Sequence, residues 1–171
     1  CLMPFPAIDP IALQLGPLVI RWYSLAYIAG IVLGWAVVRG LHKRLPIPGM
    51  TPKAFDDILL YAVLGIVLGG RLGYVLFYKP LYYLEHPLQA LALWQGGMSF
   101  HGGLIGLLLA MWLFCRKYGV PYLMLMDAAA VAAPIGLFFG RSANFINGEL
   151  YGRATDVPWG IVFPHGGDMP R

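Results

Sequence analysis

The chain has 171 residues, of which 59% are hydrophobic and 12% are charged, and its mean hydropathy is +0.69. Soluble domains usually carry about half apolar and about a quarter charged residues, so this composition excludes an ordinary soluble domain and predicts an all-α polytopic membrane protein. The net charge of +4 comes from basic residues in short gaps between apolar segments. A nucleic-acid-binding face would gather them on one soluble surface, so no nucleic-acid partner is expected.

The first apolar segment covers residues 18–39 and is interrupted only by Arg21. Prolines before it discourage a continuous helix, so residues 1–17 are predicted to be a lead-in at the membrane interface. A stretch of about 20 apolar residues is long enough to cross a hydrocarbon core of about 30 Å. Because basic residues follow this segment instead of preceding it, we interpret it as a retained transmembrane helix and not as a secretory signal.

Three further apolar segments cover residues 54–78, 98–114 and 122–140. The loop between the second and third segments contains several tyrosines and Trp94, a composition typical of a membrane interface. Residues 141–171 leave the apolar regime and contain several prolines and glycines, which predicts an extramembrane loop. We therefore expect residues 1–171 to form a single membrane domain with four transmembrane helices.

The basic residues also predict the orientation of these helices. The first and third loops carry clusters of basic residues, whereas the second loop holds only Lys79. Basic loops stay on the cytoplasmic side, so the N-terminus is expected outside. This topology places Tyr23, His101 and Arg141 near the outer ends of three helices, and Arg71 about 10 Å from the outer end of another. We expect these four side chains to converge near the outer leaflet of the membrane.

Small residues recur at intervals of four in three of the apolar segments. The pattern G-x-x-x-G occurs at residues 30–34, 65–69 and 136–140. Glycines at this spacing let the backbones of two helices approach closely in a bilayer. We interpret all three patterns as packing seams between helices, with an internal duplication as the weaker alternative.

Arg71 lies inside the second apolar segment, among several glycines. An arginine near the bilayer centre costs about 2.5 to 3.5 kcal/mol and normally faces a cavity or a partner. The sequence leaves two interpretations open. Arg71 forms a structural ion pair, for example with Asp127 or Glu149, or it binds the phosphate of a lipid.

His101 stands between two pairs of glycines, in the stretch G-G-M-S-F-H-G-G-L-I-G at residues 96–106. A lone histidine is often a structural residue with hydrogen-bond partners. Here the neighbouring glycines are expected to leave the imidazole open to a ligand, and an imidazole can take up a proton near neutral pH. We therefore predict His101 as a general base, with a structural role as the alternative.

Residues 140–152 read G-R-S-A-N-F-I-N-G-E-L-Y-G and place polar groups directly behind an apolar helix. Arg141, Asn144 and Asn147 are three residues apart, so they would share one face of a helix. Gly148 indicates that the helix ends or turns within this stretch, which would let Glu149 point back. A guanidinium forks onto phosphate oxygens and amides add neutral contacts, so the stretch predicts a phosphate site. The alternative is a polar cap at the interface.

Metal and cofactor sites are not expected from this sequence. Histidines and cysteines do not occur at ligand spacing, and the acidic residues are scattered. Phosphate-binding loops of nucleotide enzymes and dinucleotide fingerprints are also missing from the sequence.

The stretches at residues 140–152 and 96–106, together with R-W-Y at 21–23 and G-G-R-L-G-Y-V-L-F-Y at 69–78, carry a resemblance. From about Phe5 to Pro164, the sequence resembles bacterial prolipoprotein diacylglyceryl transferases. The resemblance implies an inner-membrane enzyme with its active site toward the outer leaflet. Such an enzyme transfers the diacylglyceryl group of phosphatidylglycerol to the thiol of a lipobox cysteine in a preprolipoprotein, forming a thioether and releasing glycerol phosphate.

The resemblance also implies roles for individual residues. Arg141 matches an essential arginine, and His101 matches a histidine tied to activity, so both are predicted to be catalytic. The remaining positions that are tied to activity in the family are predicted to bind substrate: Tyr23, Asn144, Glu149 and Gly152. Arg71 and Asn147 are added to the predicted substrate-binding residues because of the chemistry described above.

Three differences from the family pattern accompany this resemblance. Ala143 stands where the family often has glycine, and Arg21 stands where it usually has histidine. Members of the family continue through further helices that contribute a second essential arginine, and these lie beyond Arg171. We therefore do not expect the 171 residues alone to be a complete enzyme.

Two other functions compete with diacylglyceryl transfer. A non-catalytic transporter or channel subunit would use Arg71, Asp127 and Arg141 as an ion pathway, and it would spread polar residues through both leaflets. A CDP-alcohol phosphotransferase would need a cluster of aspartates to bind metal, whereas the aspartates here are scattered.

Overall fold

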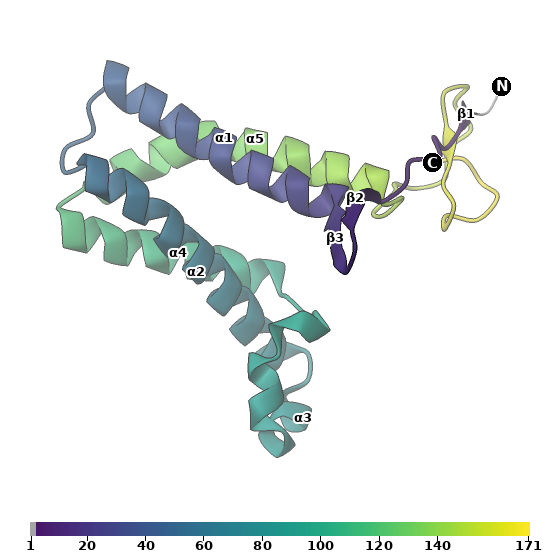
Figure 1. The fold of residues 1–171 in the computed structure, drawn as a ribbon, viewed down its shortest axis with the longest axis horizontal. Coiled ribbons are helices and arrows are strands. Elements are labelled where there is room, and N and C mark those ends of the chain that lie inside the picture. The colour runs from purple at the N-terminus through teal and green to yellow at the C-terminus, as the bar shows by residue number, and fades with distance from the viewer. Residues whose placement is uncertain (1–2) are drawn as a thin grey trace. The chain divides into compact units, whose positions relative to one another are not determined.

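The computed structural model describes residues 3–171 and divides into two compact units. One unit comprises the residues up to Val38 together with Ala129–Arg171, and the other comprises Arg39–Ala128. Figure 1 shows the helices and strands of both units along the chain. Assembly of the two units into the single membrane domain expected from the sequence stays a prediction.

Four long helices dominate the described part of the chain. Among residues 3–171, four helices are long and apolar enough to cross a membrane. This finding confirms the predicted class, an all-α protein with four membrane helices, while their orientation stays a prediction. The helices are α1 (Trp22–Arg44), α2 (Pro52–Phe77), α4 (Phe100–Tyr118) and α5 (Tyr122–Ile146).

Capping residues explain why α2 and α4 do not begin and end where hydropathy alone places them. Thr51 caps α2, since its hydroxyl oxygen accepts a hydrogen bond from the Ala54 N–H at 3.2 Å. Ser99 caps α4 in the same way, accepting from the Gly102 N–H at 3.2 Å. Gly119 ends α4 in the left-handed conformation, with φ of 68°. These caps move α4 to residues 100–118, past the predicted limit of Phe114.

A β-hairpin replaces the start of the first predicted helix. Strands β2 (Ile11–Leu15) and β3 (Leu18–Arg21) pair antiparallel, joined by a short turn at Gly16, whose φ is +60°. The expectation that residues 18–21 are helical was therefore wrong. Ile11, Leu13 and Leu15 alternate with other residues at the period of a strand, which is the signal that could have revealed the hairpin.

A second pairing joins the two ends of the first unit. Strand β1 (Met3–Pro4) pairs in parallel with β4 (Ile161–Val162). This contact fastens the N-terminal segment to the loop that follows α5.

The loop between α2 and α4 contains short helices. They are α3 (Pro80–Glu85), η1 (Pro87–Leu91) and η2 (Leu93–Gln95). Large apolar side chains on this segment point away from the protein, with exposed fractions between 73% and 85%: Leu81, Leu84, Leu88, Leu91 and Trp94. A segment of this kind suits a membrane interface, as its aromatic composition predicts.

Helices α2 and α4 pack side by side through facing glycines (Figure 1). We call Gly65, Gly69 and Gly73 of α2, with Gly102 and Gly106 of α4, the glycine seam. A Cβ atom added to Gly106 would lie 2.8 Å from the Cα of Gly69, and one added to Gly73 would lie 2.9 Å from the Cα of Gly102. Only glycine permits backbones this close, which confirms the packing seam predicted at residues 65–69.

The predicted seams at residues 30–34 and 136–140 meet each other in the first unit. A Cβ atom on Gly30 would lie 3.3 Å from the Cα of Gly136, and one on Gly34 would lie 3.6 Å from the Cβ of Ala132. A Cβ on Gly140 would meet nothing within 4 Å among the described residues. Gly30 and Gly34 therefore let α1 approach α5, whereas a Cβ on Gly136, like one on Gly140, would meet nothing within 4 Å among the described residues.

Replacement of Gly106 by alanine should destabilise the α2 and α4 pair. The added methyl group would overlap the backbone of α2, and overpacking of this kind costs about 1 to 3 kcal/mol. The midpoint of thermal unfolding of the purified protein in detergent micelles measures the effect, and it should fall.

The matched control is Gly40→Ala, because Gly40 is also helical and a Cβ there meets nothing within 4 Å. This control should keep or slightly raise the unfolding midpoint, since alanine favours helix over glycine by about 1 kcal/mol. Equal midpoints for the two variants would contradict close backbone packing at the glycine seam.

Candidate functional site

Helix α5 continues beyond the apolar segment into the polar stretch at residues 140–152. It ends at Ile146, so Arg141 and Asn144 both lie on its last turns, one turn apart. The apolar segment ends at residue 140, but the helix continues to Ile146 and ends within residues 140–152, as Gly148 predicts. Arg141 is exposed and Asn144 is half-buried.

A tight turn follows the helix, as the Asn147-Gly148 pair predicts. Gly148 has a φ of +67°, and its N–H donates to the Phe145 carbonyl at 3.0 Å. The Glu149 N–H then donates to the Asn144 carbonyl at 2.8 Å. A glycine in this left-handed conformation is the common way to end a helix. The turn brings Glu149 back toward the end of α5.

The turn and the end of α5 line an open pocket of about 250 Å³ in the first unit, with both polar and apolar walls. Arg141, Asn144, Glu149 and Gly152 all line it, so the structure brings four of the predicted residues together. Asn147 does not line this pocket, and its predicted role in binding substrate stays a prediction. The other lining residues are Phe145, Leu150, Tyr151, Phe163 and Arg171.

Three aromatic rings support the turn. Phe5, Phe145 and Phe163 come from three separate segments, and their ring centroids lie 5.3 to 5.8 Å apart. Aromatic pairs at this separation bury much apolar area and prefer tilted or edge-on geometries. The cluster fixes the end of α5 against the N-terminal segment and the later loop.

Arg171 is a pocket residue that sequence reasoning missed. Its Nε and Nη2 atoms donate to the Gly166 carbonyl at 3.1 and 2.9 Å, and its Nη1 donates to the Gly152 carbonyl at 3.1 Å. Its guanidinium also lies 4.8 Å from the ring centroid of Tyr151. Backbone carbonyls accept these bonds, so no side-chain pattern in the sequence indicates them.

Tyr23 lies at the start of α1, in the same unit as the pocket. Its hydroxyl is 3.1 Å from that of Tyr27, and the two ring centroids are 4.8 Å apart. Glu149 is close enough to interact electrostatically with Tyr23. Tyr23 thus interacts electrostatically with one of the residues that line the pocket, Glu149.

His101 belongs to the second unit, where it is the second residue of α4 and is exposed. Its ring meets that of Phe100 edge-on, with centroids 5.6 Å apart. The glycines that follow His101 pack against α2, since a Cβ on Gly103 would lie 3.5 Å from the Ile66 carbonyl. These glycines therefore serve helix packing, and the imidazole is exposed because it lies on another face of α4.

Arg71 is buried on α2, with an exposed fraction of 5%. Its four hydrogen bonds go to backbone carbonyl oxygens of Gln89, Ala90, Gly96 and Gly97. Carbonyls therefore take the place of the carboxylate partner considered from the sequence. These bonds use four of the five N–H groups of the guanidinium. Direct binding of a lipid phosphate by Arg71 stays a prediction, with one N–H group left for it.

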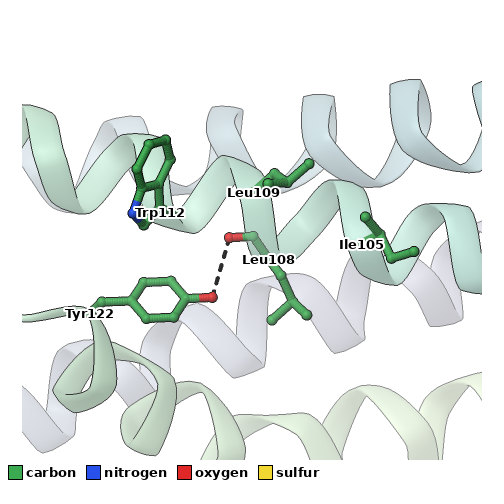
Figure 2. A pocket seen from close by; sticks show the side chains of 5 residues that line it. All are labelled: Ile105, Leu108, Leu109, Trp112 and Tyr122. Carbon is green, nitrogen blue, oxygen red and sulfur yellow. Dashed lines mark hydrogen bonds between the residues drawn. The ribbon is translucent and has the colours of Figure 1, made fainter.

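A larger hollow of about 480 Å³ lies along α4 in the second unit. Figure 2 shows that Ile105, Leu108, Leu109 and Trp112 line it together with Tyr122. The Tyr122 hydroxyl donates to the Leu108 carbonyl at 3.3 Å, so the polar atom is engaged by the protein. This hollow suits hydrocarbon and contains no ionisable group for acid-base chemistry other than that phenol.

The four apolar helices and the guanidinium-lined pocket define a multi-pass membrane protein with a polar site at the end of a membrane helix. Residues 10–171 match the family described as prolipoprotein diacylglyceryl transferase. The chain belongs to this family, as the resemblance of its motifs predicts.

Several relatives share this similarity over nearly the whole chain. Each of the following three is a phosphatidylglycerol-prolipoprotein diacylglyceryl transferase. The protein from Methylocella silvestris is 56% identical over 177 residues, which cover 99% of this chain and 65% of the relative. The protein from Paramagnetospirillum magneticum is 58% identical, covering 99% and 63%. That from Azospirillum brasilense is 60% identical, covering 94% and 60%. The chain thus spans about three fifths of the length of these relatives.

Replacement of Gly148 by alanine should weaken the turn that shapes the pocket. A residue with a Cβ pays about 1 to 2 kcal/mol in the left-handed conformation that Gly148 adopts. Hydrogen exchange followed by mass spectrometry should show that the amides of residue 148 and Glu149 exchange faster in the variant than in the parent protein.

Gly140→Ala serves as the control, since Gly140 is helical and a Cβ there meets nothing within 4 Å. It should leave exchange at the turn as slow as in the parent protein. Unchanged exchange in Gly148→Ala would mean that the turn does not depend on glycine.

Proposed function

We propose that the full-length protein transfers the diacylglyceryl group of phosphatidylglycerol to the thiol of a lipobox cysteine in a preprolipoprotein. The observation that carries this proposal is the pocket that gathers Arg141, Asn144, Glu149 and Gly152 in a member of this family. The printed names of the relatives state the same lipid and the same kind of protein substrate. The protein would work in the bacterial inner membrane, with its site toward the outer leaflet, and the distribution of basic residues supports that side.

The reaction is a substitution at a glycerol carbon. The thiol loses its proton to a base. The resulting thiolate attacks the carbon of the diacylglyceryl group that is bonded to the phosphodiester oxygen. A carbon-sulfur bond forms as the carbon-oxygen bond breaks, and the electron pair passes to the phosphate oxygen. The products are a thioether and glycerol phosphate. The base holds the proton that the thiol lost, so atoms and charge balance.

Arg141 is suited to the negative charge that grows on the leaving phosphate. It lies on the last turns of α5, exposed at the wall of the pocket, where its planar guanidinium can bind two phosphate oxygens at once. Donors that are fixed before the reaction stabilise developing charge without reorganising, and this is often the largest single contribution to catalysis. We assign Arg141 to the leaving phosphate.

The other pocket residues fit the remaining parts of a phosphatidylglycerol head group. The Asn144 amide can donate to a phosphate oxygen, and the Glu149 carboxylate can accept from glycerol hydroxyls. Gly152 leaves the wall of the pocket free of a side chain, and Tyr23, near Glu149, presents a hydroxyl. Together these groups would recognise a polar anionic head group, and Asn147 could add a contact in the bound state.

His101 is the group we assign as the base for the thiol. Thiols are mostly protonated at neutral pH, and the thiolate is the nucleophilic form, so a base would raise its concentration. His101 is exposed at the N-terminal end of α4, where a substrate can reach it.

A transporter or channel subunit is less well supported. That function would need Arg71 to line an aqueous pathway with Asp127 and Arg141. Arg71 is instead buried, and four backbone carbonyls surround its guanidinium. Its charge is thus engaged inside the second unit and does not offer a passing ion an exposed site.

Replacement of Arg141 by lysine in the full-length protein should lower kcat for thioether formation by about 100-fold or more, because lysine keeps the charge but loses the forked geometry. The assay follows transfer from phosphatidylglycerol vesicles to a lipobox peptide. Arg153→Lys is the control, since Arg153 is exposed and does not line the pocket. Turnover close to that of the parent protein in Arg141→Lys would exclude the proposed phosphate contact.

Replacement of His101 by glutamine should lower the rate by about 100-fold or more, as removal of a general base does. The dependence of the rate on pH should be flatter in the variant than in the parent protein, because the variant lacks the general base. His86→Gln controls for loss of an exposed histidine elsewhere in the second unit. An unchanged pH profile in His101→Gln would remove this residue as the base.

A further inference from the structure

We propose that Arg71 is a positioning residue, which holds the segment before α4 against α2 and thereby determines where His101 lies. The inference rests on the proposed function, because it gives Arg71 an effect on catalysis through His101. It differs from the expectation that Arg71 binds lipid phosphate directly.

The guanidinium of Arg71 occupies a site made of backbone oxygens, which we call the carbonyl site. Nε donates to the Ala90 carbonyl at 2.8 Å and Nη2 to the Gln89 carbonyl at 2.8 Å. Nη1 donates to the Gly96 carbonyl at 2.5 Å and to the Gly97 carbonyl at 3.1 Å. One side chain of α2 thus joins two parts of the loop that are far from it in sequence.

Burial makes these bonds important for the loop. The Arg71 side chain is buried, with an exposed fraction of 5%, and its bonds to the four carbonyls are partly buried. Bonds shielded from water are costly to lose, because the groups left behind lack another partner. The cation in turn needs partners, which the four oxygens supply together with two aromatic rings. Its Cζ atom is 5.8 Å from the ring centroid of Tyr74 and 5.4 Å from that of Tyr83. Loss of the guanidinium would leave the carbonyl site without donors.

The two glycines of the carbonyl site show that the loop adopts a special backbone. Gly96 and Gly97 have φ angles of +76° and +87°, which favour glycine. A Cβ on Gly97 would lie 2.5 Å from a ring carbon of Tyr74. In this conformation both carbonyls accept from the same nitrogen of Arg71, so the arginine stabilises the conformation of the chain just before α4.

The start of α4 is attached to the same part of α2. The Ser99 N–H donates to the Gly70 carbonyl at 2.9 Å, and the Ser99 hydroxyl oxygen caps the helix by accepting from the Gly102 N–H. Gly70 directly precedes Arg71 in the chain. Two adjacent residues of α2 therefore hold the chain on both sides of Met98 and fix the first turn of α4.

His101 depends on this first turn for its place. The ring contact that the structure gives it is with Phe100, its own neighbour in the chain. Its position relative to α2 is therefore determined by the backbone of α4 and not by side-chain partners on α2. Misplacement of a catalytic group by about 1 Å can lower a rate by about 100-fold.

Arg71→Lys in the full-length protein separates positioning from phosphate binding. Lysine keeps the charge but cannot fork onto several carbonyls. We expect kcat for transfer to a lipobox peptide to fall by about 10- to 100-fold, while KM for phosphatidylglycerol vesicles changes by less than about twofold. A large rise in KM with kcat unchanged would overturn the inference and favour a direct phosphate contact.

A matched control is available at the other end of α4. Arg116 is exposed and lies with its Cζ atom 5.0 Å from the ring centroid of Trp112. Arg116→Lys makes the same chemical change without touching the carbonyl site, and it should leave kcat and KM unchanged. A loss of kcat in Arg116→Lys equal to that in Arg71→Lys would overturn the inference.

A double-mutant cycle with His101→Gln tests whether Arg71 acts through the histidine. If it does, Arg71→Lys should lower kcat by less than about threefold when His101 is already replaced, because the residue it positions is gone. Fully additive losses in the double variant would overturn the inference. Tyr83→Leu provides a milder variant for the same cycle if Arg71→Lys does not fold, since it removes one ring that faces the guanidinium.

Hydrogen exchange tests the contact without depending on activity. The amides of Ser99 and Gly102 should exchange at least about tenfold faster in Arg71→Lys, while those in α5 keep their rates. Unchanged protection at Ser99 and Gly102 would overturn the positioning role. If the parent protein has no transferase activity, the proposed function fails, and the exchange rates still show whether Arg71 fixes the start of α4.

Discussion

Helices α2 and α4 touch through their backbones, and this contact is the constraint on which the second unit depends. Side chains would separate two helices, but the glycine seam removes them where the helices meet. The start of α4 can therefore reach the Gly70 carbonyl, and the loop before it can reach Arg71. A wider spacing would place both contacts out of reach. The glycines thus determine the polar contacts as well as the packing.

Each unit uses an arginine to fix a glycine-containing segment by its backbone. Arg71 donates to the carbonyls of Gly96 and Gly97 ahead of α4, and Arg171 donates to that of Gly152 at the wall of the pocket. Glycine-rich backbone is flexible and has no side chain through which a neighbour could hold it. A planar group with five donors solves this problem, because it binds the carbonyls that every residue has. In this protein an arginine can therefore fix the backbone conformation of a segment without contacting the substrate.

Hydropathy and charge predicted the part of the structure that depends on side-chain character. The four membrane helices follow from apolar length, and Arg141, Asn144 and Glu149 reach one pocket because Gly148 ends α5 where the sequence indicates. The limits of α1, α2 and α4, the hairpin at residues 11–21 and the surroundings of Arg71 did not follow. Helix caps, turn geometry and carbonyl acceptors determine these features. Such contacts depend on the backbone conformation, which cannot be predicted from composition.

The exposed leucines between α2 and α4 have a consequence for how the protein sits in a bilayer. The segment that carries them is joined to buried Arg71 by four hydrogen bonds, so it cannot move independently of α2. Removing a large apolar side chain from lipid into water costs about 1.5 to 3 kcal/mol. A displacement of the helix pair along the membrane normal would expose several of them together. In a bilayer, the segment would therefore resist displacement of α2 and α4 along the membrane normal.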